Sequence, residues 1–199
     1  MPQPEPLRLF IALELPDHVL QALQTLQSRL RQQPGGQAVR WVRPEGIHLT
    51  LKFLGEVPAR QEADITRAME AAALGHTALA LQAMGVGCFP NPRKPRVIWV
   101  GLAGDLARLN ALQGAVERAL NPLGFPPEKR GFSPHLTLGR TRRDARPDAI
   151  RALSALVTGV QVESPLAEWE AASVSLIRSE LRPDGARYTR LASAALRTP

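Results

Sequence analysis

The chain has 199 residues, of which 44% are hydrophobic and 22% charged, a composition typical of a globular protein and not of a disordered or fibrous one. Its longest apolar runs fall short of the roughly 18 residues that a membrane-spanning helix needs, and its first residues lack the features of a secretory signal. Lys and Arg number 25 against 18 Asp and Glu, and the net charge of +7 favours anionic partners. Because Cys88 is the only cysteine, an internal disulfide and a thiolate zinc cluster are excluded. We expect a cytoplasmic protein.

Strand-like and helix-like patterns alternate along the chain. Residues 7–15 form a strongly apolar run, which predicts a buried strand. The apolar residues of 17–33 recur at the spacing of a helix, which Pro34-Gly35-Gly36 terminates. Further helices are expected at 59–73, 105–120 and 148–157. Further strands are expected at 39–42, 47–54, 79–87, 96–102, 135–141, 161–163, 172–181 and 187–194, the last two as a hairpin around Pro183-Asp184-Gly185.

The tetrapeptide His-Leu-Thr-Leu occurs twice, at residues 48–51 and 135–138, each time in an expected strand. The two copies are 135 − 48 = 87 residues apart, a distance too long for a solenoid repeat. We infer two related lobes, each of which supplies one copy of the tetrapeptide.

Side chains alternate between the two faces of a strand. In each copy the histidine and the threonine therefore share a face, His48 with Thr50 and His135 with Thr137, while the leucines point into the apolar layer. If the lobes pack face to face, two imidazoles and two hydroxyls converge on one cleft.

Such a group of side chains suits the cleavage of a phosphodiester. A histidine with a pKa near 6.5 can either take a proton from water or protonate the departing oxygen at neutral pH, and the hydroxyls can donate hydrogen bonds to the non-bridging oxygens. A lone histidine in a strand is more often a structural residue, but a duplicated tetrapeptide is not readily accidental. A metal site is the rival interpretation; it is disfavoured because neither histidine has a second ligand at suitable spacing in its strand and HExxH and CxxC motifs are absent.

These ordered motifs resemble those of the 2H phosphoesterase superfamily, and within it the RNA 2′,3′-cyclic phosphodiesterases, historically called 2′-5′ RNA ligases. The resemblance covers nearly the whole chain. Its landmarks are Arg8-Leu9-Phe10-Ile11-Ala12, Trp41-Val42, the stretches 46–57, 95–99 and 133–140, and the terminal hairpin from Ser175 to Tyr188.

The resemblance implies a bilobal α+β fold, in which two antiparallel sheets related by a pseudo-twofold axis carry outer helices and enclose an active-site cleft. Residues 1–199 are then a single domain. It also implies metal-independent chemistry without a cofactor. By this resemblance His48 is the proton donor to the leaving 3′ oxygen, His135 is the proton acceptor that activates water, and Thr50 and Thr137 bind the phosphate.

Three further residues are candidates for contacts with RNA or phosphate. Because side chains alternate along a strand, Lys52 is expected on the same face as His48 and Thr50, where it could approach the phosphate. A solvated lysine at the strand end is an equal alternative. Arg140 follows the second motif, where the family often carries an arginine, but strict alternation places it on the leucine face unless Gly139 marks a bulge. Phe10 is a candidate for stacking on a base, with core packing as the alternative.

We therefore expect hydrolysis of the 2′,3′-cyclic phosphate at RNA ends to a 2′-phosphomonoester, with tRNA fragments or small cyclic nucleotides as substrates. Two alternatives stay open. One is a 2′-5′ RNA ligase that uses the same groups in the reverse direction, and the other is a non-catalytic module that binds RNA ends or nucleotides. The absence of coiled-coil heptads favours a monomer.

Overall fold

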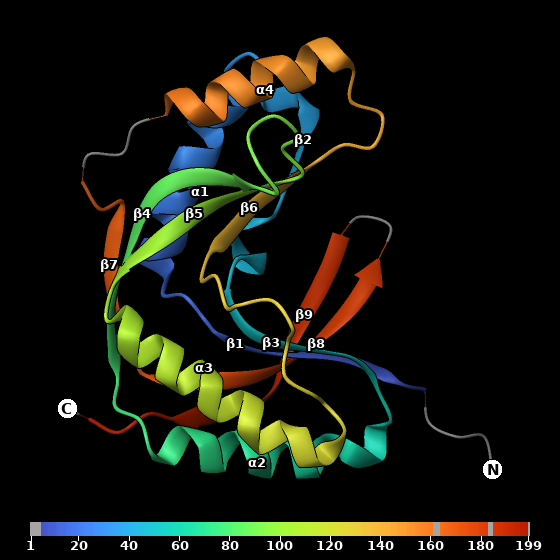
Figure 1. The fold of residues 1–199 in the computed structure, drawn as a ribbon, viewed down its shortest axis with the longest axis vertical. Helices are drawn as coiled ribbons and strands as arrows, with labels where there is room; N and C mark the ends of the chain where they lie inside the picture. Colours follow the sequence, from blue (N-terminus) through green and yellow to red (C-terminus); the bar gives the residue numbers. More distant parts are fainter. Residues whose placement is uncertain (1–4, 161–163, 183–184, 199) are drawn as a thin grey trace.

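Two antiparallel sheets and four α-helices make up the computed structural model, which describes residues 5–160, 164–182 and 185–198 (Figure 1). Sheet A has the order β3–β1–β8–β9, with β1 at Leu7–Leu13, β3 at Leu49–Val57, β8 at Ser173–Arg182 and β9 at Gly185–Ala195. Sheet B has the order β2–β6–β5–β4–β7, with β2 at Val39–Trp41, β4 at Leu79–Phe89, β5 at Val97–Gly104, β6 at Leu136–Thr141 and β7 at Ala167–Ala171. The α-helices are α1 at Asp17–Gln32, α2 at Glu62–Leu74, α3 at Leu106–Leu120 and α4 at Pro147–Gly159, and short 3-10 helices lie at Gly36–Ala38, Pro44–Gly46, Ala59–Gln61 and Asn121–Leu123.

The helices cover one face of each sheet. α2 and α3 pack against sheet A, and α1 and α4 pack against sheet B (Figure 1). Their apolar stripes supply the core: in α1, Val19, Leu23 and Leu30 are buried at helical spacing. The same stripe of α1 also buries a polar residue, Gln27, which is 3% exposed.

The chain crosses repeatedly between the two sheets. β1 and β3 lie in sheet A but are separated in sequence by β2 of sheet B, and β8 returns from the C-terminal part of the chain to pair with β1. The two tetrapeptides consequently lie in different sheets, the first at β3 and the second at β6. The prediction of an α+β fold with one His-Leu-Thr-Leu strand in each of two antiparallel sheets is confirmed.

The secondary structure departs from the expected pattern at β7. Its sequence Ala-Glu-Trp-Glu-Ala is rich in residues that disfavour strands, and pairing with β4 at the sheet edge overrides that preference. The strand expected at 161–163 and the turn at 183–184 lie outside the described residues, whereas the hairpin pairing of β8 with β9 is confirmed. No helix within the described ranges has the length and apolarity required to cross a membrane.

Candidate active site

One residue of β3 bulges out of the ladder with β1 directly after Thr50. Thr50 pairs with Ala12 and Lys52 pairs with Ile11, so Leu51 has no partner of its own. Because Ile11 and Ala12 are consecutive and lie on opposite faces of β1, the bulge places Lys52 on the face opposite to Thr50. We call the face of sheet A that carries Thr50 its motif face.

The prediction that Lys52 lies on the face of His48 is therefore wrong, because the bulge shifts the alternation of all side chains that follow it. The lysine side chain is turned toward α3, where its ammonium forms a buried ion pair with Glu117. It also donates a hydrogen bond of 2.9 Å to the carbonyl oxygen of Pro126. Since Lys52 is only 3% exposed, the alternative of a solvated lysine is wrong as well.

Phe53 takes the position on the motif face that Lys52 was expected to hold. It pairs with Phe10 across the ladder, and the two ring centroids are 6.1 Å apart. The Phe53 side chain is 60% exposed. Sequence patterns missed this residue, because the bulge that redirects it depends on the register with β1.

β6 carries a matching bulge after the second tetrapeptide. Thr137 pairs with Trp99 and Gly139 pairs with the residue before Trp99, so Leu138 has no partner in β5. Arg140 in turn pairs with the residue two before Trp99, which places it on the face of Thr137, and its side chain is exposed. A bulge thus re-aims Arg140 as expected, although it falls at Leu138 and not at Gly139. We call this side of sheet B its motif face.

The imidazole of His48 is enclosed by aromatic rings of sheet A. Phe10 of β1 stacks on it with ring centroids 4.5 Å apart, and Tyr188 of β9 meets it edge-on at 5.2 Å. Phe10 is 3% exposed and packs with Tyr188 as well, so its ring is occupied by these contacts. The core-packing alternative describes Phe10 better than an open stacking surface.

The imidazole of His135 has a corresponding environment in sheet B. Phe89 of β4 meets it edge-on at 4.9 Å, and the indole of Trp99 lies at 6.5 Å. The indole covers Gly87, where an added Cβ would lie 2.3 Å from a ring carbon of Trp99. A glycine at this point of β4 leaves room for the indole to pack against the strand.

Each histidine is oriented by the backbone two residues before it. Nδ1 of His135 lies 2.7 Å from the carbonyl oxygen of Ser133, and His48 makes a hydrogen bond to the backbone of Gly46. A carbonyl oxygen only accepts, so Nδ1 of His135 carries a proton and Nε2 is left for chemistry.

Charged groups of sheet B affect the pKa values of groups in sheet A. Burial lowers the pKa of His48 from 6.5 to about 4. The hydrogen bond to Gly46 and the carboxylate of Glu14 raise this pKa, while the positive charge of His135 lowers it. Burial likewise raises the pKa of Tyr188, and the guanidinium of Arg140 in the other sheet lowers it. The two histidines are therefore close enough to interact.

The threonines complete the motif faces. Thr50 and Thr137 are both half-buried, and within the described part of the chain neither hydroxyl has a hydrogen-bond partner. Both hydroxyls can therefore donate to a ligand between the sheets.

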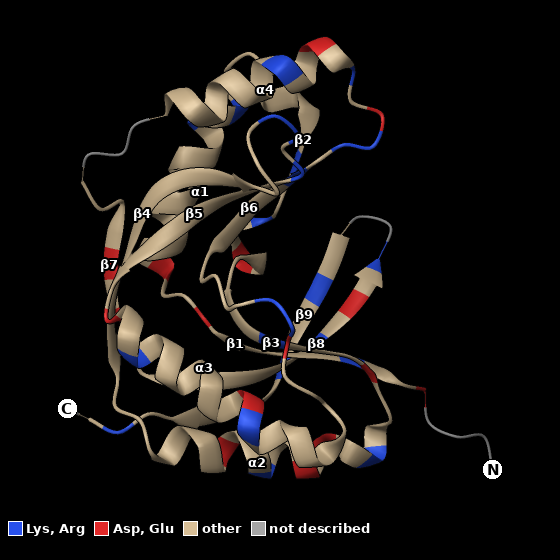
Figure 2. Cartoon of the chain, in the orientation of Figure 1, with Lys and Arg blue, Asp and Glu red and all other residues tan. Residues whose placement is uncertain are grey.

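Cationic residues are numerous on segments next to the motif strands in both sheets. Figure 2 marks Lys and Arg positions along the backbone of the β4–β5 loop, of β6 and the segment after it, and of the β8–β9 hairpin. They are Arg93, Lys94, Arg96, Arg140, Arg142, Arg143, Arg178, Arg182, Arg187 and Arg190. Arg178 and Arg182 form ion pairs with Glu180, and Arg190 forms one with Glu14. The remaining excess of positive charge favours an anionic ligand.

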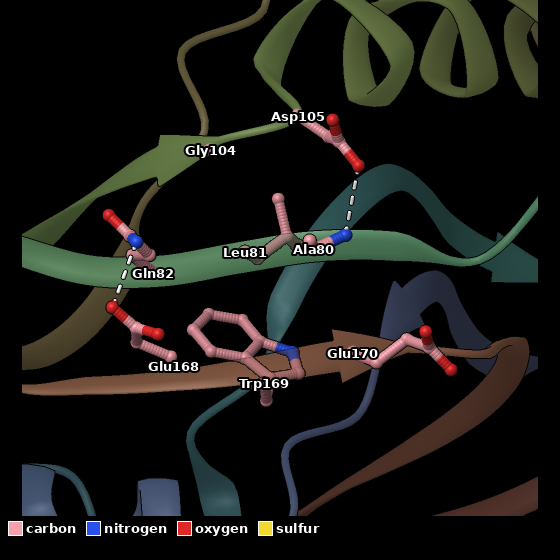
Figure 3. Close-up of a pocket in the computed structure, with 8 residues that line it drawn as sticks. All are labelled: Ala80, Leu81, Gln82, Gly104, Asp105, Glu168, Trp169 and Glu170. Atoms are coloured by element: carbon pink, nitrogen blue, oxygen red, sulfur yellow. Dashed lines mark hydrogen bonds between the residues drawn. The ribbon is translucent and has the colours of Figure 1, made fainter.

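A separate hollow lies between β4, β7 and the start of α3 (Figure 3). Three carboxylates line it: Asp105 accepts from the amide of Ala80, Glu168 accepts from the side chain of Gln82, and Glu170 lies beside them. A lining of this charge repels phosphate. Nowhere in the described ranges do three or more His, Cys, Asp or Glu side chains form a group that could hold a metal ion.

Comparison with known proteins matches the chain twice to the family described as LigT like Phosphoesterase, at residues 13–99 and 100–188. His48 and His135 each stand 35 residues after the start of their match (48 − 13 and 135 − 100). The RNA 2′,3′-cyclic phosphodiesterase of Methanothermobacter thermautotrophicus is 34% identical over 92% of this chain and 95% of that protein.

Two solved structures share the fold. TT0787 of Thermus thermophilus has a TM-score of 0.73 at 31% identity, covering 96% of this chain and 98% of that one. E. coli LigT complexed with 3′-AMP has a TM-score of 0.75 at 25% identity, covering 96% and 99%. Because the two family matches span most of the chain and each contains one His-Leu-Thr-Leu strand, the protein belongs to the LigT-like phosphoesterase family, a family of enzymes.

Proposed function

We propose that the protein hydrolyses the terminal 2′,3′-cyclic phosphate of RNA to a 2′-phosphomonoester by acid–base catalysis without a metal ion. The observation that carries the proposal is the pair of His-Leu-Thr-Leu strands, which present two electrostatically coupled imidazoles from different sheets. The name of the methanogen relative and the 3′-AMP complex of E. coli LigT support the same reaction class and a nucleotide substrate.

The proposed roles assign one proton transfer to each histidine. His135 accepts a proton from water as the water oxygen bonds to phosphorus, and His48 gives a proton to the 3′ oxygen as the P–O3′ bond breaks. Thr50 and Thr137 donate hydrogen bonds to the non-bridging oxygens, whose charge is redistributed in the transition state. In the reverse, joining direction the donor and acceptor exchange.

The bound substrate favours the protonated form of His48, which a proton donor needs. With a pKa of about 4, the imidazole of His48 is neutral at neutral pH in the free protein. A phosphate anion bound beside it favours the protonated form and raises this pKa. The positive charge of His135 opposes protonation of His48.

The neighbouring side chains of the motif faces suit a nucleotide. Phe53 offers an exposed aromatic face next to Phe10, the ring that stacks on His48, and a base can stack on it. Arg140 stands at the corresponding place in the other sheet, five residues after its histidine as Phe53 is after His48, and offers a cation to a phosphate. We propose these two residues as the contacts outside the tetrapeptides.

The test is incubation of the protein with an oligonucleotide that ends in a 2′,3′-cyclic phosphate, in the presence of EDTA. We expect a 2′-phosphate product. A 3′-phosphate product contradicts the assignment of the leaving oxygen, and binding without turnover supports a non-catalytic module instead. A second reaction with an added 5′-hydroxyl oligonucleotide measures joining against hydrolysis.

A further inference from the structure

Each bulge behind an active-site threonine exposes a backbone carbonyl that a glutamine side chain bonds. The amide of Gln27 on α1 donates to the carbonyl oxygen of Leu138 at 2.8 Å. The amide of Gln113 on α3 donates to the carbonyl oxygen of Leu51 at 3.4 Å. Leu51 has no partner in the ladder of β3 with β1, and Leu138 has none in the ladder of β6 with β5, so the same kind of contact holds the bulge that follows each motif threonine.

Gln27 also joins the second motif to the segment that leads into the first. Its amide donates a second hydrogen bond, of 2.9 Å, to the carbonyl oxygen of Val42, six residues before His48. The amide of Val42 in turn donates to the carbonyl oxygen of Leu138 at 2.9 Å. One buried side chain therefore ties the bulge after Thr137 to the approach to His48.

The network around Lys52 makes the converse connection in sheet A. Gln113 donates to Glu117 at 3.0 Å, and Glu117 forms the ion pair with Lys52. The ammonium of Lys52 bonds the carbonyl of Pro126, nine residues before His135. The bulge after Thr50 is thereby tied to the approach to the second histidine.

The support is reciprocal between the two family matches. α1 lies in the first match and holds the bulge of the second motif, while α3 lies in the second match and holds the bulge of the first. Gln27 occupies a position in the apolar stripe of α1 that an apolar residue of similar volume would fill without the cost of burying a polar group. The gain from the amide is therefore geometric: it fixes where the backbone of the motif lies.

We propose that Gln27 and the Lys52–Glu117–Gln113 network are positioning residues, which hold the two His-Leu-Thr-Leu strands in the one relative placement that catalysis needs. The proposal rests on the proposed function. It assigns to these four side chains the alignment of both histidines and both threonines, although none of the four lies on a motif face.

The experiment compares Gln27→Met with Gln24→Met, an exposed glutamine one turn earlier on α1. We expect Gln27→Met to lower kcat by about 10- to 100-fold with KM close to that of the parent, because small misplacements of reacting groups are costly. Gln24→Met keeps the parent kcat. Amide exchange at Val42 and the imidazole NMR resonances of His135 change in the first variant only.

A Gln27→Met protein that is folded at the assay temperature, exchanges faster at Val42 and keeps the parent kcat overturns the proposal, because the contact is then merely structural. If Gln27→Met does not fold, the double variant Lys52→Met/Glu117→Met, which leaves no unpaired charge, takes its place with the same expected loss of kcat. A parent chain without hydrolytic activity contradicts the proposed function instead. The positioning role is then decided by the His135 resonances, and unchanged resonances in the variant overturn it.

Discussion

The imidazole of His48 should cost the protein stability in acid. Burial lowers its pKa from 6.5 to about 4, so between these pH values the unfolded chain binds a proton here and the folded protein does not. Stability is lost as the pH falls through this window and the loss levels off below it. At about 1.4 kcal/mol for each pKa unit, the loss amounts to ~3 kcal/mol.

The substitution His48→Gln removes this titration. Denaturant unfolding of both proteins at pH 7 and pH 4 gives the free energy of unfolding, and other acid-sensitive groups affect both proteins alike. We expect the parent chain to lose about 3 kcal/mol more than the variant between the two pH values. His135→Gln is the matched control, because it retains the His48 imidazole and with it the loss in acid. Equal pH dependence of the parent and His48→Gln would refute the reasoning.

Three further predictions concern activity. His48→Ala and His135→Ala should each lower turnover by about 10²- to 10⁴-fold, and the activity of the parent protein should persist in EDTA. Activity that is lost in EDTA and restored by Zn²⁺ would favour the metal interpretation. Because His48 acts as the proton donor, its deprotonation should begin to limit kcat/KM above about pH 4, its pKa in the free protein, and should limit kcat only at higher pH, because bound phosphate raises this pKa; onset at the same pH in both would contradict such coupling. Phe53→Leu should raise KM by about 5- to 100-fold, the range that corresponds to the loss of one stacked base. An abasic cyclic-phosphate substrate should not show that loss, and the exposed control Leu74→Ala should leave KM unchanged; equal losses on both substrates would argue against stacking.

The amino-acid sequence alone predicts the chemistry-bearing strands because their signals are local. Alternation over four residues places His48 with Thr50 and His135 with Thr137, and the buried leucines of both copies agree with that pattern. Apolar periodicity likewise predicts the four helices to within a few residues. The duplication of the tetrapeptide predicts two sheets that contribute one motif each.

Only the tertiary structure decides what lies around those motifs. Lys52 turns to Glu117 and Phe53 turns to the motif face because β3 bulges against β1, a pairing partner some forty residues earlier in the chain. Tyr188, the half-buried ring beside His48, comes from the C-terminal hairpin, which is placed there by the pairing of β8 with β1. Register between distant strands sets the parity of every residue beyond a bulge, and no local pattern encodes that register.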